Sequence, residues 1–124
     1  MDPLRESPVM GSRDGNCIFC KIIDRQIPSN IISEDETSIA IRDVNPQAPT
    51  HILIMPKNHI ANITQLNNAE TLGSLFMKVS EIAQSENLQK GFRTVVNTGE
   101  HGGQTVDHLH IHVIGGRQLH WPPG

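Results

Sequence analysis

The sequence lacks the features by which several classes of protein are recognised. It has no run of lysine or arginine and a formal net charge of −3, so we expect no surface that holds nucleic acid through clustered cations. Its longest apolar run, Ile52 to Met55, is a strand's worth, and we expect no membrane span. It has neither a GxxxxGK[ST] motif nor an acidic cluster suited to a metal. Its first residues lack an apolar core, which argues against a signal peptide.

Cysteine is also scarce. The only two, Cys17 and Cys20, form one CxxC motif, so a disulfide framework is excluded and a reducing compartment is expected, the cytoplasm or alternatively the nucleus. The spacing is that of half a zinc site, and nothing around it indicates a thioredoxin-type redox motif. A complete site needs two more ligands, for which His59 and His108 are the candidates. The alternative is a pair of reduced thiols in the core.

The sequence does have the composition of an ordinary globular domain, with 36% hydrophobic and 19% charged residues. Residues 1–14 are polar and aperiodic, which predicts a disordered tail before a folded domain at 15–124. The best helical pattern covers residues 67–89, with Asn67 as its cap and Gly91 as its end. Apolar residues recur on one face of it at helical spacing: Leu72, Leu75, Phe76, Val79, Ile82 and Ala83.

Apolar and alternating segments predict the strands. They cover residues 30–33, 37–43, 51–55, 92–98 and 106–114, and a short helical turn precedes them and ends near Ile27. Strands before and after one long helix indicate an α+β domain with a mostly antiparallel sheet.

The segment DHLHIHV places His108, His110 and His112 at every second position. On a strand they share one face, about 6.6 Å apart from one to the next, while the intervening apolar residues face a core. Crowded imidazoles stay mostly neutral unless an anion lies among them, so the natural ligands are a metal or a phosphate. The carboxylate-containing patterns of common histidine metal sites are absent. The glycine-rich GEHGGQT before the strand, with the Thr105 hydroxyl, predicts an anion nest and favours phosphate over chance surface histidines.

These residues resemble a known family. HLHIHVI resembles the His-φ-His-φ-His-φ-φ signature (φ, apolar) of the histidine triad (HIT) superfamily. The longer GGQTVDHLHIHVIGGRQLHWPPG is similar to the C-terminal end of its nucleotide-binding branch, the purine nucleoside phosphoramidases. IFCKII, AIRDVNPQAPTHILIMPKNHI and RTVVNTGEHGGQ resemble the same branch in the same order, so the likeness covers about residues 15–124.

The resemblance implies a HIT-like fold whose five-stranded sheet pairs with that of a second copy into one ten-stranded sheet. It implies a homodimer that hydrolyses AMP or GMP joined through a P–N bond to an amine, or as a mixed anhydride to an acid. No metal is needed for this chemistry. Some members of the superfamily and related uridylyltransferases hold zinc on a CxxC and two histidines, which supports structural zinc on Cys17, Cys20, His59 and His108.

The resemblance also implies a role for each site residue. His110 is the nucleophile, His108 and His51 orient the site, and Thr105 assists the leaving group. His112 holds the phosphate together with the amides of Gly103, Gln104 and Thr105. Other residues bind the remainder of the nucleotide: Asn97 near the 5′ oxygen, Asp43 on the ribose hydroxyls, and Phe19, Ile22, Ile41, Val44 and Leu53 around the base. Trp121 reaches the partner's active site and tunes the choice of leaving group.

Several alternatives remain beside these roles. Asp43 could simply bond its own loop, and Trp121 could be a packing or interface residue. Ile22, Val44 and Leu53 could simply belong to the core. The whole protein could bind nucleotides or act as a scaffold with incidental hydrolysis. It could also hydrolyse dinucleoside polyphosphates, but that branch typically has Gln where this sequence has His112.

Three positions depart from the pattern of the branch. Ile41 stands where an aromatic residue is often found, which weakens stacking on the base. Thr105 stands where Ser is common and adds a methyl group beside the hydroxyl. Asp107 adds a negative charge next to the histidines, which is expected to raise their pKa values or to disfavour acidic leaving groups.

Overall fold

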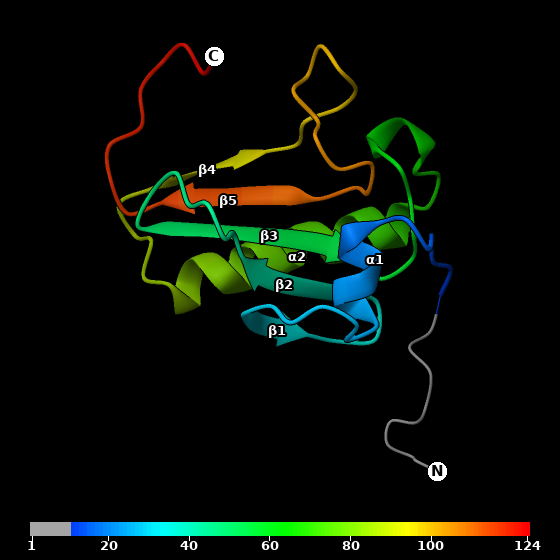
Figure 1. Cartoon of the computed structure of the whole chain (residues 1–124). Coiled ribbons are helices and arrows are strands. Elements are labelled where there is room, and N and C mark those ends of the chain that lie inside the picture. The colour runs from blue at the N-terminus through cyan, green and yellow to red at the C-terminus, as the bar shows by residue number, and fades with distance from the viewer. Residues whose placement is uncertain (1–10) are drawn as a thin grey trace.

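A computed structural model describes residues 11–124 and shows one antiparallel sheet with a long helix against it (Figure 1). The five strands are β1 Ile31–Glu34, β2 Ser38–Arg42, β3 Thr50–Pro56, β4 Phe92–Val95 and β5 Ile111–Gly115. Their order across the sheet is β1-β2-β3-β5-β4, and every neighbouring pair is antiparallel. The helices are α1 Ile18–Ile23, the short 3-10 helix η1 Ile63–Gln65, and α2 Ala69–Ser85. The predicted α+β class, with five strands and one long helix, is confirmed.

The sheet separates two apolar clusters, because side chains alternate between its faces. β3 is buried along its whole length and contributes to both clusters. Ile52 and Ile54 pack in the cluster that contains the buried face of α2, whereas Leu53 and Met55 pack in the cluster that contains α1. Figure 1 shows the two helices on opposite faces of the sheet. A strand covered on both faces needs a continuous apolar run, which accounts for ILIM in the sequence.

α2 begins and ends inside the predicted range of 67–89. Its cap is Asn68 and not Asn67, because the side chain of Asn68 accepts hydrogen bonds from two amides of the first turn. The helix stops before Asn87, whose left-handed φ of 59° does not continue a right-handed helix. The expected end at Gly91 is therefore wrong, and a short connection lies between the helix and β4.

The apolar face of α2 is narrower than its spacing predicts. The residues that it buries against the sheet include Leu75, Val79, Ile82 and Ala83. Leu72 and Phe76 were expected on the same face but are 37% and 42% exposed. They lie at the border of the buried stripe, so the sheet of this chain does not cover them.

β5 starts later than predicted, at Ile111, so His108 and His110 precede the strand. The alternation nevertheless continues through the preceding segment. Leu109 packs in the same cluster as Ile111 and its amide donates to a carbonyl of the loop after β3, at 2.6 Å. The histidines consequently face the other way, toward α1, as the spacing predicted.

The chain before α1 contacts the domain within the described residues. The amide of His59 donates to the carbonyl of Ser12 at 3.0 Å, and the amide of Ser12 donates to the side chain of Asn58 at 2.8 Å. The expectation of a disordered tail over residues 1–14 thus fails for its last residues, and its part over residues 1–10 lies outside the described residues. Among residues 11–124, no helix is long and apolar enough to cross a membrane.

Candidate functional site

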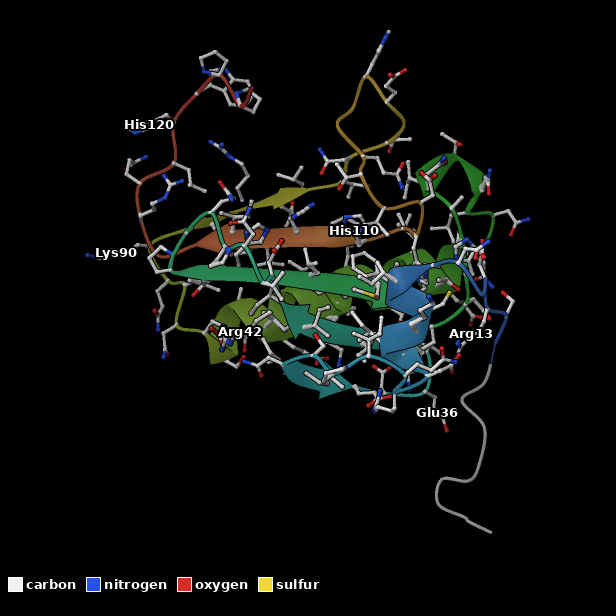
Figure 2. All side chains as sticks on the ribbon, in the orientation of Figure 1. Arg13, Glu36, Arg42, Lys90, His110 and His120 are labelled. Carbon is white, nitrogen blue, oxygen red and sulfur yellow. The ribbon has the colours of Figure 1, made fainter. Side chains whose placement is uncertain are left out.

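The ring of His110 is buried and held by the backbone two residues before it. Its Nδ1 lies 2.6 Å from the carbonyl oxygen of His108, which can only accept, so Nδ1 carries the proton. The ring of Phe19 from α1 meets it edge-on, with centroids 5.1 Å apart. In a neutral imidazole, Nε2 then keeps the lone pair. His110 and this carbonyl lie just before the start of β5, and His110 lies on the side of the sheet that carries α1 (Figure 2).

His112 receives its orientation from a different strand. The amide of Gln47 donates to Nδ1 of His51 at 3.0 Å, so the single proton of a neutral His51 is on Nε2. That Nε2 lies 2.9 Å from Nδ1 of His112 and donates to it. His112 therefore carries its own proton on Nε2. His110 and His112 are neighbours, with ring centroids 5.0 Å apart, and present a lone pair and an N–H respectively.

Burial keeps these imidazoles neutral. It lowers the pKa of His108 to about 4, because desolvation of the ring outweighs its hydrogen bond to the Pro56 carbonyl. It also lowers the pKa of His112 to about 4, with the neighbouring histidines adding to the effect. Desolvation lowers the pKa of His51 and of His110 as well, and the carboxylate of Asp43 only partly opposes it. At neutral pH the rings are thus uncharged, as the crowding predicted.

Asp43 lies at the end of β2, beside His51. Its Oδ2 is 3.4 Å from Nε2 of His51, and its Oδ1 accepts from the amide of Asn45 at 2.8 Å. One carboxylate oxygen thus bonds the loop, as the modest alternative predicted, while the other faces the histidines. Both readings of Asp43 are compatible with this geometry.

Most of the apolar residues assigned to the base lie together on the α1 side of the sheet. Four of them belong to one buried cluster: Phe19, Ile22, Ile41 and Leu53. Val44 does not belong to it, because its side chain is 95% exposed, so the reading of Val44 as core is wrong. Trp121 is 82% exposed, in the C-terminal segment that follows β5.

The glycine-rich turn does not form the expected nest of free amides. The amide of Gly103 donates to the carbonyl of Glu100 at 3.0 Å, and the amide of Gln104 donates to that of Gly99 at 3.1 Å. These bonds close the turn on itself, so two of the three amides predicted to hold phosphate are already used. Within residues 11–124 the amide of Thr105 donates to no carbonyl, and its side chain is exposed.

Asn97 stabilises this turn in the structure. Its Nδ2 donates to the carbonyl of Gly102 at 2.7 Å. A Cβ atom at Gly102 would lie 2.3 Å from the carbonyl oxygen of Thr98, so the close approach of the two strands of the turn requires glycine there. The side chain of Asn97 therefore holds the turn that carries Thr105. This turn follows β4, which forms one edge of the sheet.

The four residues predicted to bind zinc converge, although His108 and Cys17 are 91 positions apart in sequence. One ligand atom from each lies within 4.8 Å of the others. Nδ1 of His108 is 3.4 Å from Sγ of Cys17 and 3.6 Å from Sγ of Cys20, and Nδ1 of His59 is 3.3 Å from Sγ of Cys20. A tetrahedral zinc site has sulfur-to-nitrogen edges of about 3.6 Å, so the spacing fits.

The tautomer of His108 also fits a metal ligand. Its Nε2 donates to the carbonyl of Pro56 at 2.8 Å, which leaves the lone pair on Nδ1, facing the two thiols. Asp14 adds two contacts around the same cluster. Its amide donates to Sγ of Cys20 at 3.3 Å, and its Oδ2 lies 3.8 Å from Nε2 of His59. Burial raises the pKa of the Cys20 thiol to about 11, so a cation is needed to hold it as a thiolate.

A second group of possible metal ligands consists of Asp43, His51 and His112, whose ligand atoms also lie within 4.8 Å of one another. Its hydrogen bonds argue against a metal there. Because Nδ1 of His51 accepts from the amide of Gln47, a metal on Nε2 would require His51 to be an imidazolate. The backbone thus leaves His108 with a lone pair that faces the thiols of its cluster, whereas it places a proton on the Nε2 of His51 that faces the other cluster.

Sequence reasoning missed two contributors, Gln47 and Asp14. Gln47 acts through its backbone amide, which no residue type encodes. The one available signal is its position between Pro46 and Pro49, two residues that favour an irregular loop before His51. Asp14 was assigned to the tail. Its signal was its place three residues before Cys17, whose amide donates to the carbonyl of Asp14 at 3.0 Å.

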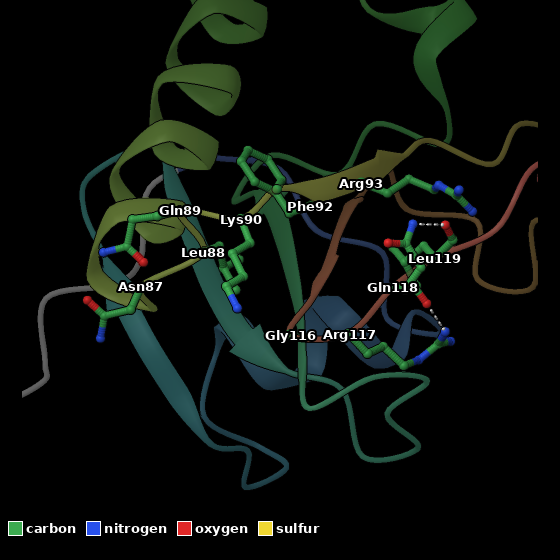
Figure 3. A pocket seen from close by; sticks show the side chains of 11 residues that line it. Asn87, Leu88, Gln89, Lys90, Phe92, Arg93, Gly116, Arg117, Gln118 and Leu119 are labelled. Atoms are coloured by element: carbon green, nitrogen blue, oxygen red, sulfur yellow. Dashed lines mark hydrogen bonds between the residues drawn. The ribbon is translucent and has the colours of Figure 1, made fainter.

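A hollow of about 650 Å³ lies elsewhere, between the connection after α2 and the segment after β5 (Figure 3). Its lining includes Lys90, Arg93 and Arg117 but no histidine. It is therefore separate from the histidine site.

Known proteins resemble this chain over most of its length. The HIT domain matches residues 24–119. An uncharacterized HIT-like protein of Synechococcus elongatus is 55% identical over 109 residues, which is 86% of this chain and 96% of that protein. A 14 kDa zinc-binding protein of Zea mays is 45% identical over the full length of both. The crystal structure of a HIT family hydrolase from Legionella pneumophila is 47% identical, covers 88% of this chain and all of its own, and superposes with a TM-score of 0.86.

Proposed function

The chain belongs to the HIT domain family, and on that premise we propose that it hydrolyses purine nucleoside phosphoramidates and acyl-adenylates through a nucleotidyl-histidine intermediate. The observation that carries the proposal is the pairing of tautomers at the triad. His110 offers a lone pair on Nε2, and the neighbouring His112 offers an N–H on Nε2. A nucleophile beside a hydrogen-bond donor is what attack on a phosphorus bearing charged oxygens requires.

The first chemical step transfers the nucleotide to His110. Its Nε2 lone pair attacks the α-phosphorus and forms a new P–N bond, while the bond to the leaving nitrogen or oxygen breaks. Positive charge that develops on the ring is stabilised by the Nδ1–H bond to the carbonyl of His108. His112 donates to a non-bridging oxygen, and the exposed hydroxyl of Thr105 relays a proton from solvent to the leaving amine.

The second step returns the enzyme to its starting state. Water attacks the same phosphorus, the bond to Nε2 breaks, and water gives up one proton as the nucleoside monophosphate leaves. No residue needs a bound metal for either step, because the charge on phosphate is met by N–H groups.

The nucleotide is bound by the face of the sheet that carries α1. Asp43 directs one carboxylate oxygen away from its loop and bonds the vicinal hydroxyls of the ribose. Apolar side chains of α1, β2 and β3 form the base slot: Phe19, Ile22, Ile41 and Leu53, with Val44 at its exposed rim. Asn97 supports the turn near the 5′ oxygen. The amides of Gly103 and Gln104 take no part in phosphate binding, because they already bond carbonyls within the turn.

Zinc is assigned to Cys17, Cys20, His59 and His108. The support is the fit of their spacing, the lone pair on Nδ1 of His108, and the likeness to the zinc-binding protein of Zea mays. When bound, the metal supplies structural rigidity: it fixes the segment from which the carbonyl of His108 holds His110. Zinc held by thiolates also agrees with the reducing, cytoplasmic location expected from the cysteine content.

The proposed homodimer is supported by the edge of the sheet at β4. This strand has one unpaired side, and Phe92 on it and Phe76 on α2 are 41% and 42% exposed around a shallow apolar hollow. A two-fold pairing of β4 edges extends the two sheets into ten strands and covers both aromatic rings. The exposed Trp121 then reaches the partner's active site.

Trapping the intermediate tests the function. The protein is mixed with adenosine 5′-phosphoramidate, quenched in denaturant at alkaline pH within one turnover, and digested for mass spectrometry. AMP on the peptide that carries His110, followed by release of free AMP, supports the proposal. Tight binding of AMP with no adduct and no turnover of any P–N or acyl-phosphate substrate contradicts it and favours a nucleotide-binding or scaffolding protein. Turnover of a dinucleoside polyphosphate that is faster than turnover of the phosphoramidate favours a dinucleoside polyphosphate hydrolase.

A further inference from the structure

Arg117 connects the segment after β5 to the loop between β2 and β3. Its Nε and Nη2 both donate to the carbonyl of Gln47, at 3.2 and 2.8 Å. Its Nη1 donates to the carbonyl of Gln118 at 2.9 Å, a bond drawn in Figure 3. Among residues 11–124, the guanidinium of Arg117 bonds these two carbonyl oxygens and forms no ion pair with an acidic side chain. Two N–H groups of one guanidinium thus fix one peptide oxygen of the loop.

The neighbouring backbone keeps the two segments in contact. Gly116 adopts a φ of +95° and packs so closely on Pro49 that a Cβ atom would lie 2.9 Å from the Cβ of that proline. Figure 1 shows the loop and the start of the C-terminal segment at the same end of the sheet. Arg117 therefore bonds Gln47 from a segment of the backbone that itself packs against the loop.

Gln47 transmits this contact to the histidines. Its amide is the donor to Nδ1 of His51, and the Nε2–H of His51 is the donor to Nδ1 of His112. Each bond decides which nitrogen of the next ring carries the proton. If the amide moves away, His51 can place its proton on Nδ1 and turn Nε2 into an acceptor. His112 must then protonate Nδ1, and its Nε2 can no longer donate. Asp43, 3.4 Å from Nε2 of His51, favours the same tautomer, so the experiment measures what the contact through Gln47 adds to it.

We propose that Arg117 is a positioning residue for the reaction: by clamping the carbonyl of Gln47, it selects through His51 the tautomer in which His112 donates from Nε2. The proposal deepens the proposed function and rests on it for its kinetic consequence. The tautomer itself is a property of the protein without substrate, so it can be measured independently.

The experiment compares wild type with Arg117→Ala and Arg117→Lys, and uses Lys90→Ala as the matched control. Lys90 lines the same hollow as Arg117, and replacing it removes the same single positive charge. Among the described residues, its side chain forms no hydrogen bond with the loop between β2 and β3. Protein labelled with ¹⁵N at histidine is studied by long-range ¹H–¹⁵N correlation, which distinguishes protonated from unprotonated ring nitrogens. The signals of His51 and His112 are assigned by their loss in the His51→Ala and His112→Ala variants. Turnover is measured on adenosine 5′-phosphoramidate, and thermal melting shows that each variant is folded.

In wild type and Lys90→Ala we expect His112 to carry its proton on Nε2 alone. In Arg117→Ala we expect a mixture of tautomers, with kcat lower by about tenfold and KM changed by less than about twofold. Arg117→Lys, whose ammonium can donate to the same carbonyl, should restore the tautomer and most of kcat. In a His51→Ala background, Arg117→Ala should have no further effect, because its route to His112 is already cut.

Two outcomes overturn the inference. One is a folded Arg117→Ala variant in which His112 keeps its proton on Nε2 alone and kcat is unchanged. The other is that Arg117→Ala lowers kcat by the same factor in wild type and in the His51→Ala background. If the tautomers respond as expected but no phosphoramidate is hydrolysed, the inference about Arg117 stands and the proposed function fails.

Discussion

The ring of His110 is held by the backbone of His108, whose carbonyl oxygen lies 2.6 Å from Nδ1. The same His108 directs its own Nδ1 toward Cys17 and Cys20. One residue therefore belongs to the candidate zinc cluster through its side chain and positions the nucleophile through its main chain. If zinc binds as proposed, this relationship would connect the metal to the position of the His110 ring.

Replacing the nucleophile should abolish the covalent step. We expect His110→Ala to lower kcat by about a thousandfold or more, because the remaining N–H groups bind phosphate but cannot form a P–N bond. Steady-state release of AMP and the adduct assay measure the loss. His120→Ala is the control, since that side chain is exposed and far along the C-terminal segment (Figure 2). A His110→Ala variant with wild-type turnover would show that another group attacks phosphorus.

Zinc should be present at about one ion per protomer in protein purified without chelator, as measured by elemental analysis. Cys20→Ser should lose the metal and lower the melting temperature, because the folded state no longer gains the binding energy. Protein that contains no zinc and melts at the same temperature with and without added metal would leave Cys17 and Cys20 as reduced core thiols.

The carboxylate of Asp14 should tune the zinc affinity, because its Oδ2 lies 3.8 Å from Nε2 of His59. We expect Asp14→Ala to weaken zinc binding by about tenfold in competition with a chromophoric chelator. Asp107→Ala is the matched control, because Asp107 is an exposed acid that lines the same surface hollow as Asp14 and His59. Equal affinities in the two variants would show that the carboxylate of Asp14 plays no part.

Breaking the apolar surface at the β4 edge should give monomers. We expect Phe92→Asp combined with Phe76→Asp to halve the mass measured by light scattering after size exclusion, because the charge would be buried without a partner. Ile18→Asp is the control, since Ile18 is 47% exposed on α1, on the opposite face of the sheet from α2. A wild-type protein that is already monomeric would refute the proposed dimer.

Asp35 should make stability depend on pH in the acid range. Burial alone would raise the pKa of this carboxyl, but the amides of Thr37 and Ser38 and the ammonium of Lys78 outweigh it and lower the pKa to about 2. Its stabilisation is thus complete above the unfolded pKa of about 3.9 and is lost as the pH falls toward 2.

The measurement is urea unfolding of wild type and Asp35→Ala between pH 2 and 6. The difference in unfolding free energy should be largest near pH 6 and should shrink as the pH falls. Glu36→Ala, which removes an exposed acid next in sequence, is the control (Figure 2). A difference that is constant with pH would mean that Asp35 acts through packing rather than through charge.

The sequence by itself determined the α+β class and the two faces of the histidine segment. These follow from local rules: alternation places Leu109 and Ile111 opposite the histidines, and helical spacing predicts α2 to within a few residues. Sequence alone missed the end of α2, since the left-handed backbone at Asn87 stops the helix before the glycine that was expected to end it.

Tertiary structure decided which nitrogen of each histidine carries the proton. His51, His108, His110 and His112 are chemically identical in the sequence, yet Gln47, Pro56 and the backbone of His108 give them different tautomers. It also decided that the amides of the glycine-rich turn bond each other instead of forming a nest. The physical reason is that a ring proton goes to the nitrogen that faces an acceptor, as in His108 and His110, or stays off the nitrogen that faces a donor, as in His51. These partners come from whichever segments the fold brings within 3 Å or so.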